Sequence, residues 1–294
     1  MGVSLNGRAK CNGRPMVAAR NMLLNPSLRL AREPAPPTTI RSELARSRSA
    51  LVALSGGVDS SVVALLAYQA LGSKAVAVTL SGPAVSSHET QSATEVALAI
   101  GIPHLILTSD PLSDSRYAKN PANRCYFCRS HEGGLLRTWG DQHAIELYLD
   151  GIHADDFGDD RPGLQAMNEH GFRHPLAEAG WTKADVRAFA RAAELPTWDR
   201  PSNACLASRI AHGQPITAPL LERVAKAEEW LTARGFRRAR VRVSGDHVRV
   251  EVDPPDVPRL QSKNIATPLG EVLAHLGFTS VEIDPNGYRS RSDA

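Results

Sequence analysis

The spacing of apolar residues predicts a parallel α/β fold for residues 49–213. Short apolar runs, typical of buried strands, alternate with longer stretches in which apolar residues recur at helical spacing. Strands are expected at residues 50–54, 74–80, 104–108 and 145–151, and helices at residues 62–71, 90–100, 121–142, 161–169 and 182–193, the last capped by Thr182. This order indicates a doubly wound parallel sheet with helices on both faces.

From about residue 214 the pattern changes and predicts a small α+β domain. An amphipathic helix is expected at residues 219–234, followed by strands at 238–243 and 247–252, a helix at 267–276 and a strand at 280–283. Ser244-Gly245-Asp246 is typical of a hairpin turn between the first two strands. We therefore assign residues 49–213 and 214–294 to separate domains, the second for substrate binding or oligomerisation.

Residues 1–48 are expected to form a basic, disordered tail. They are rich in Arg, Pro and Ala, show little periodicity, and contain nine basic residues against two acidic ones, a net charge of +7. An Arg-rich, acid-poor start is also typical of a transit peptide. A disordered extension or an upstream start codon explains the same composition more simply.

The charge of the remaining chain argues against nucleic acid as a partner. The other 246 residues carry 25 basic and 29 acidic side chains, a net charge of −4, which is unlike the basic surface of most nucleic-acid binders. No apolar run reaches 18 residues, so no membrane span is expected. Four cysteines without a secretory signal indicate a reducing compartment, and we expect a cytoplasmic protein.

A glycine loop at residues 55–61 follows the first strand. Glycines allow a tight turn and a close ligand, and the N–H groups at the start of the next helix form an anion site, with Asp59 or Ser60 as the expected N-cap. No Gly-Lys-[Ser/Thr] follows, so it is not a Walker A loop. The loop resembles the pyrophosphate loop of the ATP pyrophosphatase superfamily, which splits ATP between its α- and β-phosphates. We expect ATP to be bound by Ser55, Gly56, Gly57, Asp59, Ser60 and Ser61, with Mg²⁺ offsetting the phosphate charge and Asp59 as a candidate ligand of the metal.

Three cysteines form a second candidate site. Cys125 and Cys128 are spaced like the start of a zinc or iron–sulfur site, and Cys205 is the third candidate ligand. The cysteines alone allow three interpretations. They are free buried thiols, a zinc site closed by a fourth ligand such as His131, or a three-cysteine iron–sulfur cluster with an open metal position.

Six short motifs surround the cysteines and the glycine loop. They are Asn120-Pro-x-x-Arg-Cys-Tyr-Phe-Cys128, Asp150-Gly151 with Ala154-Asp-Asp156, Asp160-Arg-Pro-Gly163, His174-Pro-Leu-x-Glu-Ala-Gly180, Ala204-Cys-Leu-Ala-Ser-Arg209 and Asp284-Pro-Asn-Gly-Tyr-Arg289. Together with the loop, they resemble the LarE family of ATP-dependent sulfur transferases. The resemblance runs from about residue 51 to residue 289.

This resemblance implies a role in biosynthesis of the nickel-pincer cofactor of lactate racemase-type enzymes. LarE-type proteins adenylate the carboxylates of pyridinium-3,5-biscarboxylic acid mononucleotide and replace oxygen by sulfur. One branch of the family sacrifices the sulfur of the cysteine that matches Cys205. The other branch has all three cysteines and is thought to deliver sulfur through a [4Fe-4S] cluster, so Cys125, Cys128 and Cys205 place this chain with the cluster branch.

The resemblance also implies substrate-binding residues and partners. Arg240 and Arg242 alternate with Arg238 along one expected strand and so share a face. With Arg209 and Arg289, they are the expected anion-binding residues. A sulfide or sulfur-donor system, other proteins of nickel-pincer biosynthesis and a homo-oligomeric assembly are the expected partners. A solvated sheet face explains the alternating arginines equally well.

Four alternatives compete with this interpretation. A tRNA-thiolating enzyme also combines a pyrophosphate loop with a three-cysteine cluster, but the negative charge of residues 49–294 argues against it. An ammonia-using ligase leaves the cysteines without a role. The loop and the thiols together argue against a non-enzymatic nucleotide-binding module. Sacrificial transfer from Cys205 is the fourth alternative.

Overall fold

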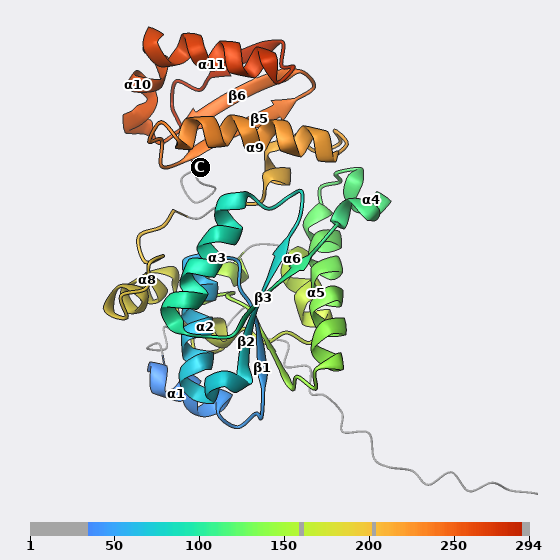
Figure 1. Ribbon diagram of the computed structural model, residues 1–294, viewed down its shortest axis with the longest axis vertical. Coiled ribbons are helices and arrows are strands. Elements are labelled where there is room, and N and C mark those ends of the chain that lie inside the picture. The colour runs from blue at the N-terminus through green and yellow to red at the C-terminus, as the bar shows by residue number, and fades with distance from the viewer. Residues whose placement is uncertain (1–34, 159–161, 202–203, 290–294) are drawn as a thin grey trace, which may run out of the picture. The chain divides into compact units, whose positions relative to one another are not determined.

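The computed structural model describes residues 35–158, 162–201 and 204–289 (Figure 1). All of the described residues belong to one compact unit, so the expected boundary near residue 213 remains a prediction. Most of the expected tail lies outside the described residues. None of the described helices is long and apolar enough to cross a membrane.

Four parallel strands form the larger sheet, in the order β3-β2-β1-β4. The strands are β1 (Ala50–Ala53), β2 (Ala75–Ser81), β3 (His104–Thr108) and β4 (Leu147–Leu149). All four lie within or next to the expected ranges. The parallel sheet predicted from the alternating pattern is confirmed.

Helices cover both faces of this sheet, as predicted (Figure 1). Side chains alternate along β1, so that Ala50 and Val52 pack into one buried cluster while Leu51 packs into another. The first cluster includes side chains of α2 (Val58–Leu71), α3 (Ser87–Ile100) and α8 (Lys183–Ala192), and the second includes side chains of α5 (Arg124–Gln142) and α6 (Pro162–Glu169). Thr182 caps α8 as expected, because its side chain accepts from the N–H of Asp185.

Helix α1 (Pro37–Leu44) lies inside the range expected to be a disordered tail. Ile40 and Leu44 are 3% and 1% exposed and join the cluster that contains α2. Proline suits the first turn of a helix, because the N–H it lacks has no partner there. The spacing of apolar residues did not predict α1, because a helix of eight residues with only two strongly buried positions shows no clear periodicity.

The C-terminal segment forms a three-stranded sheet in the order β5-β6-β7. Strands β5 (Ala239–Ser244) and β6 (His247–Val252) are antiparallel, and β7 (Ser280–Ile283) runs parallel to β6. One face of β5 and β6 is a row of buried valines that packs with α9 (Ala218–Thr232), α10 (Val257–Gln261) and α11 (Lys263–His275). The other face carries Arg240, Arg242, Arg249 and Glu251.

Asn120 joins the segment before α5 to the segment after Cys205. It is fully buried, and its Nδ2 donates to the carbonyl oxygens of Ala211 and Gln214 at 2.8 and 3.0 Å. Nearby, the N–H of Ile216 donates to the carbonyl of Ala118 at 2.8 Å. These bonds hold two cysteine-bearing segments together, although some 80 residues separate them along the chain.

Candidate active site

The glycine loop lies at the carboxyl end of β1 and leads into α2. The expected N-cap is wrong: Gly57 is the N-cap, without a side-chain hydrogen bond, and Asp59 and Ser60 lie in the first turn of α2. The Ser60 and Ser61 hydroxyls donate to the carbonyl of Gly57 at 3.2 and 2.7 Å. Because no side chain caps the helix, its first N–H groups face a site that suits an anion.

Two glycines allow other segments to approach this loop. Gly56 has a φ of +77°, and a Cβ there would lie 2.6 Å from the carbonyl oxygen of Glu89 at the start of α3. A Cβ on Gly151, just after β4, would lie 2.6 Å from the backbone nitrogen of Ser60. The loop therefore lies between α3 and the turn after β4. Strands β1 and β4 are neighbours in the sheet, and the chain leaves them toward opposite faces. Ligands of such sheets usually bind at the carboxyl ends of two strands arranged in this way.

Lys183 lies against Asp59 and was missed by the sequence analysis. Its Nζ donates to both carboxylate oxygens of Asp59, at 2.7 and 2.5 Å, across 124 residues of sequence. Lys183 is the first residue of α8, and its backbone N–H donates to Asp155 at 2.8 Å. A lysine beside a phosphate-binding loop can neutralise phosphate charge. The site therefore contains a positively charged side chain, Lys183, as well as the expected Asp59 carboxylate.

The three cysteines lie near one another at the start of α5. Cys125 is exposed, and Cys128 and Cys205 are half-buried. Burial raises the pKa of the Cys128 thiol, with Glu132 and Cys205 acting in the same direction. Burial also raises the pKa of Cys205, and Cys125 adds to the effect. The thiols therefore share one environment, in which Cys128 donates to Glu132 at 3.4 Å.

The described part of the chain contains no group of three His, Cys, Asp or Glu side chains arranged to hold a metal ion. His131, named above as an example of a fourth zinc ligand, does not join the cysteines in such a group. A tetrahedral zinc site is therefore not formed by the described residues.

Arg209 fixes the backbone around Cys205. Its side chain is 1% exposed, and its Nε donates to Glu228 at 2.8 Å. One terminal nitrogen donates to the carbonyl oxygens of Ala204 and Cys205 at 2.8 and 3.2 Å. These contacts give Arg209 a positioning role, and its role in substrate binding remains a prediction.

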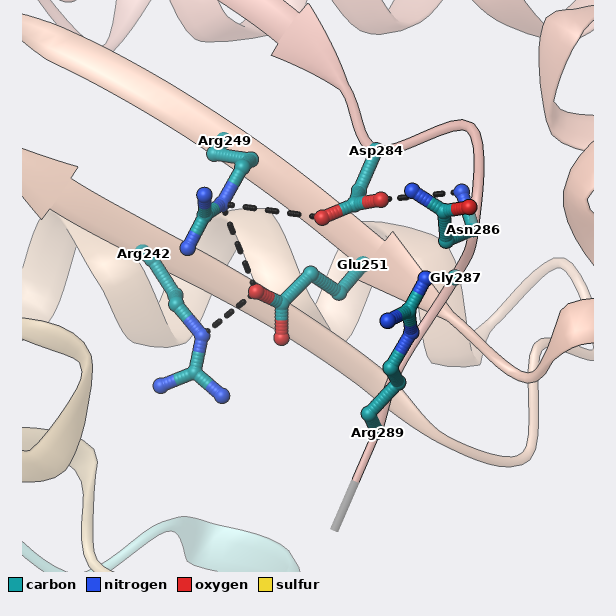
Figure 2. Close-up of a pocket in the computed structure, with 7 residues that line it drawn as sticks. All are labelled: Arg242, Arg249, Glu251, Asp284, Asn286, Gly287 and Arg289. Carbon is teal, nitrogen blue, oxygen red and sulfur yellow. Dashed lines mark hydrogen bonds and ion pairs between the residues drawn. The ribbon is translucent and has the colours of Figure 1, made fainter. Parts of the chain in front are cut away.

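A charged hollow of about 400 Å³ lies on the polar face of the small sheet (Figure 2). Arg242 and Arg249 face each other across β5 and β6, and Glu251 lies between them, with Oε1 2.6 and 3.4 Å from their Nε atoms. Arg249 also pairs with Asp284 at 3.9 Å. Figure 2 shows Arg289 on the other side of Glu251. Two of the four expected anion-binding arginines, Arg242 and Arg289, therefore line one hollow.

Arg240 lies apart from the lining of this hollow. It is 7% exposed, with its guanidinium 5.5 Å from the ring centroid of Tyr288. Burial lowers the pKa of Arg240 to about 10, and the neighbouring Arg209 adds to this effect. Arg240 shares a sheet face with Arg242, as predicted, but is buried too deeply to line the same hollow.

Comparison with known proteins identifies the family. The chain is 32% identical over 240 residues to the pyridinium-3,5-bisthiocarboxylic acid mononucleotide synthase of Lactiplantibacillus plantarum, covering 81% of this chain and 86% of that protein. The chain belongs to this synthase family. It is also 38% identical to an uncharacterized protein of Synechocystis sp., over 82% of this chain and 90% of that protein. Residues 38–119 match the NAD synthase family, which places the pyrophosphate loop inside the matched region.

Family membership confirms the resemblance found in the sequence, which is to the LarE synthases. Three residues of the site were not singled out there: Lys183, Tyr117 and Glu132. Lys183 follows a capping threonine, a position that gives no sign of its distant partner. Tyr117 and Glu132 flank the cysteine motif in sequence, but only the structure places both beside the thiols.

Proposed function

We propose that this chain is an ATP-dependent sulfur transferase that makes pyridinium-3,5-bisthiocarboxylic acid mononucleotide. The substrate is the corresponding biscarboxylic acid mononucleotide, whose two carboxylates are adenylated and thiolated in turn. The identity to the Lactiplantibacillus plantarum synthase over most of both chains carries this proposal. The product is the precursor of the nickel-pincer cofactor of lactate racemase-type enzymes.

The glycine loop serves the activation step. A substrate carboxylate oxygen attacks the α-phosphorus of ATP, and the bond to the β-phosphate oxygen breaks, giving an acyl-adenylate and pyrophosphate. The N–H groups at the start of α2 bind the phosphates, and Lys183 supplies a positive charge to the leaving pyrophosphate. Mg²⁺ would offset the remaining charge, with Asp59 as its proposed ligand once Lys183 turns from that carboxylate to the phosphates.

The cysteines serve the second step, in which sulfur replaces AMP. A sulfur nucleophile attacks the acyl carbon, AMP leaves with the bonding electrons of the C–O bond, and a thiocarboxylate remains. Adenylation is needed because a free carboxylate is a poor electrophile. If Cys205 is the donor, its thiolate forms a thioester, and loss of the Cα proton then releases the thiocarboxylate and leaves dehydroalanine.

The proposed ligand of the three thiols is a [4Fe-4S] cluster rather than a single metal ion. A cluster holds its cysteines on separate iron atoms, so its ligands lie farther apart than those of one ion. Cys125 and Cys128 lie one helical turn apart, and Cys205 approaches from another segment. When bound, a cluster would supply the sulfur atom in a deprotonated, nucleophilic form. Arg209 would hold the Cys205 backbone in place through its bonds to two carbonyl oxygens.

The charged hollow is the proposed site for the anionic groups of the substrate. Arg242, Arg249 and Arg289 offer planar donors that match phosphate and carboxylate oxygens. Arg240 and Arg209 would act from buried positions, through the field that they create rather than by direct contact. A homo-oligomer, a sulfide source and the other proteins of nickel-pincer biosynthesis are the proposed partners.

The test is anaerobic reconstitution of the full chain with iron and sulfide, followed by incubation with ATP, Mg²⁺ and the pyridinium biscarboxylic acid mononucleotide. The expected products are pyrophosphate, AMP and the bisthiocarboxylic acid, with an iron–sulfur absorption band before the reaction. Cys205 converted to dehydroalanine would replace cluster delivery by sacrificial transfer. Thiolation of bulk tRNA without turnover of the mononucleotide would contradict the proposal.

A further inference from the structure

Tyr117 buries a hydroxyl group for which the described residues provide no hydrogen-bond partner. The residue is 1% exposed, and its hydroxyl oxygen is among the few buried polar atoms left unpaired. Such a group lowers the stability of the folded protein, because water satisfies it in the unfolded chain. A phenylalanine would fill the same space without this penalty. The hydroxyl therefore calls for an explanation other than packing.

The surroundings of this hydroxyl include two of the three cysteines. Tyr117 belongs to the buried cluster against which Cys128 and Cys205 pack. Burial raises the pKa of the phenol, Cys128, Cys205 and Glu132 act in the same direction, and Arg124 opposes them. The phenol thus keeps its proton at neutral pH, and the ionisable groups around it are those of the sulfur site.

The backbone of Tyr117 is held firmly in this position. It lies in the short helix α4 (Ser115–Ala118), whose last carbonyl accepts from Ile216 at 2.8 Å. The carbonyl of Tyr117 itself accepts from the N–H of Asn120 at 2.9 Å, and Asn120 is bonded in turn to the segment after Cys205.

We propose that Tyr117 is a positioning residue that donates its O–H to the sulfur atom that the protein transfers. This inference rests on the proposed function and adds a specific donor to it. An O–H group beside an anionic sulfur stabilises its negative charge and fixes its direction, and hydrogen bonds to sulfur tune iron–sulfur centres in the same way. Because the hydroxyl has no partner among the described residues, its acceptor is a sulfur atom bound among the three cysteines and not a cysteine sulfur of the chain itself.

The test compares Tyr117→Phe with Tyr148→Phe, which makes the same chemical change at another buried tyrosine. The Tyr148 hydroxyl donates to Asp141 at 2.8 Å, in the cluster on the α5 and α6 face of the large sheet. Without iron or sulfide, Tyr117→Phe is expected to melt at or above the temperature of the unmodified protein. Tyr148→Phe is expected to melt lower, because the hydrogen bond from its hydroxyl to Asp141 is lost.

In sulfur transfer the order of the two variants is reversed: Tyr117→Phe is expected to be impaired and Tyr148→Phe to be normal. After anaerobic reconstitution, Tyr117→Phe is expected to release pyrophosphate at the normal rate but to insert sulfur about tenfold more slowly. The midpoint potential of its iron–sulfur chromophore should shift to more negative values, since a hydrogen bond to sulfur stabilises the reduced state. Tyr148→Phe should change neither quantity. If no chromophore forms, the sulfur-insertion rate alone decides.

Two results would overturn the inference. One is an unchanged sulfur-insertion rate in Tyr117→Phe, with an unchanged potential where a chromophore forms. The other is a melting temperature well below that of the unmodified protein, which would mean that the hydroxyl has a structural partner such as a buried water. An unmodified protein that never releases pyrophosphate would instead contradict the proposed function, and the role of Tyr117 with it.

Discussion

Lys183 offers the sharpest test of the activation step, because its structural and chemical contributions differ in size. In Lys183→Met the aliphatic stem remains and only the charged end is lost. The ion pair with Asp59 joins atoms 2.5–2.7 Å apart, but the two side chains are 28% and 24% exposed. Water screens such a pair, so its loss should lower the free energy of unfolding by about 1 kcal/mol.

The chemical effect should be larger. A charged donor that contacts the leaving pyrophosphate contributes about 1.5–3 kcal/mol. Its removal should therefore slow pyrophosphate release by about 10- to 100-fold. Urea denaturation measures the first quantity, and a coupled pyrophosphate assay at saturating substrate measures the second.

Two control variants isolate the phosphate contact. Lys183→Arg keeps the charge and should retain most of the activity. Lys226→Met breaks an exposed ion pair with Glu222, at 2.7 Å on the surface of α9, and should leave both quantities unchanged. A folded Lys183→Met protein that releases pyrophosphate within about twofold of the normal rate would refute the reasoning.

Three further predictions concern the loop, the cysteine segment and pH. Gly56→Ala should abolish ATP-dependent pyrophosphate release while thermal melting still shows a folded protein, because the new Cβ would lie 2.6 Å from the Glu89 carbonyl and distort the loop. Arg209→Leu should cost about 3–5 kcal/mol in urea denaturation, because Glu228 would keep a charge without its buried partner. Burial lowers the pKa of His104, so the unfolded chain binds its proton first, and stability should fall as pH drops below the ordinary value of 6.5. His104→Gln should flatten that decline in a series of melting curves.

The fold was predictable because its signals are local. The runs at β1 and β3 are bounded by glycine, proline or polar residues, and each is recognisable within about eight residues of sequence. Helix α1 escaped because its stability comes from packing of Ile40 and Leu44 against α2, and not from a long periodic pattern. The N-cap of α2 was misplaced because both candidate side chains point to other partners, Asp59 to Lys183 and Ser60 to the Gly57 carbonyl.

The site was predictable only in part, since its contacts join residues far apart in sequence. The motifs indicated the loop, the cysteines, Arg209 and Arg289, and alternation along a strand with the family resemblance indicated Arg240 and Arg242, but neither signal says which side chains are buried. Arg209 and Arg242 have the same charge and appear equivalent in sequence. In the structure, Arg209 is 1% exposed and binds backbone carbonyls, whereas Arg242 lines an open hollow. Burial, which depends on the whole fold, therefore distinguishes an arginine that holds the backbone from one that is open to a ligand.

The segment from α8 to Arg209 links the two halves of the proposed reaction. Lys183 at its start contacts Asp59 in the glycine loop, and Arg200 farther along donates to the carbonyl of Gly56 at 3.4 Å. The same segment then reaches Cys205, whose carbonyl accepts from Arg209. Phosphates bound at the loop would draw Lys183 away from Asp59. Nucleotide binding would therefore break a contact made by the segment that carries Cys205. Lys183, proposed for adenylation, and Cys205, proposed for sulfur transfer, therefore lie on one segment of the chain, 22 residues apart. The two proposed steps are linked through this segment as well as through their shared substrate.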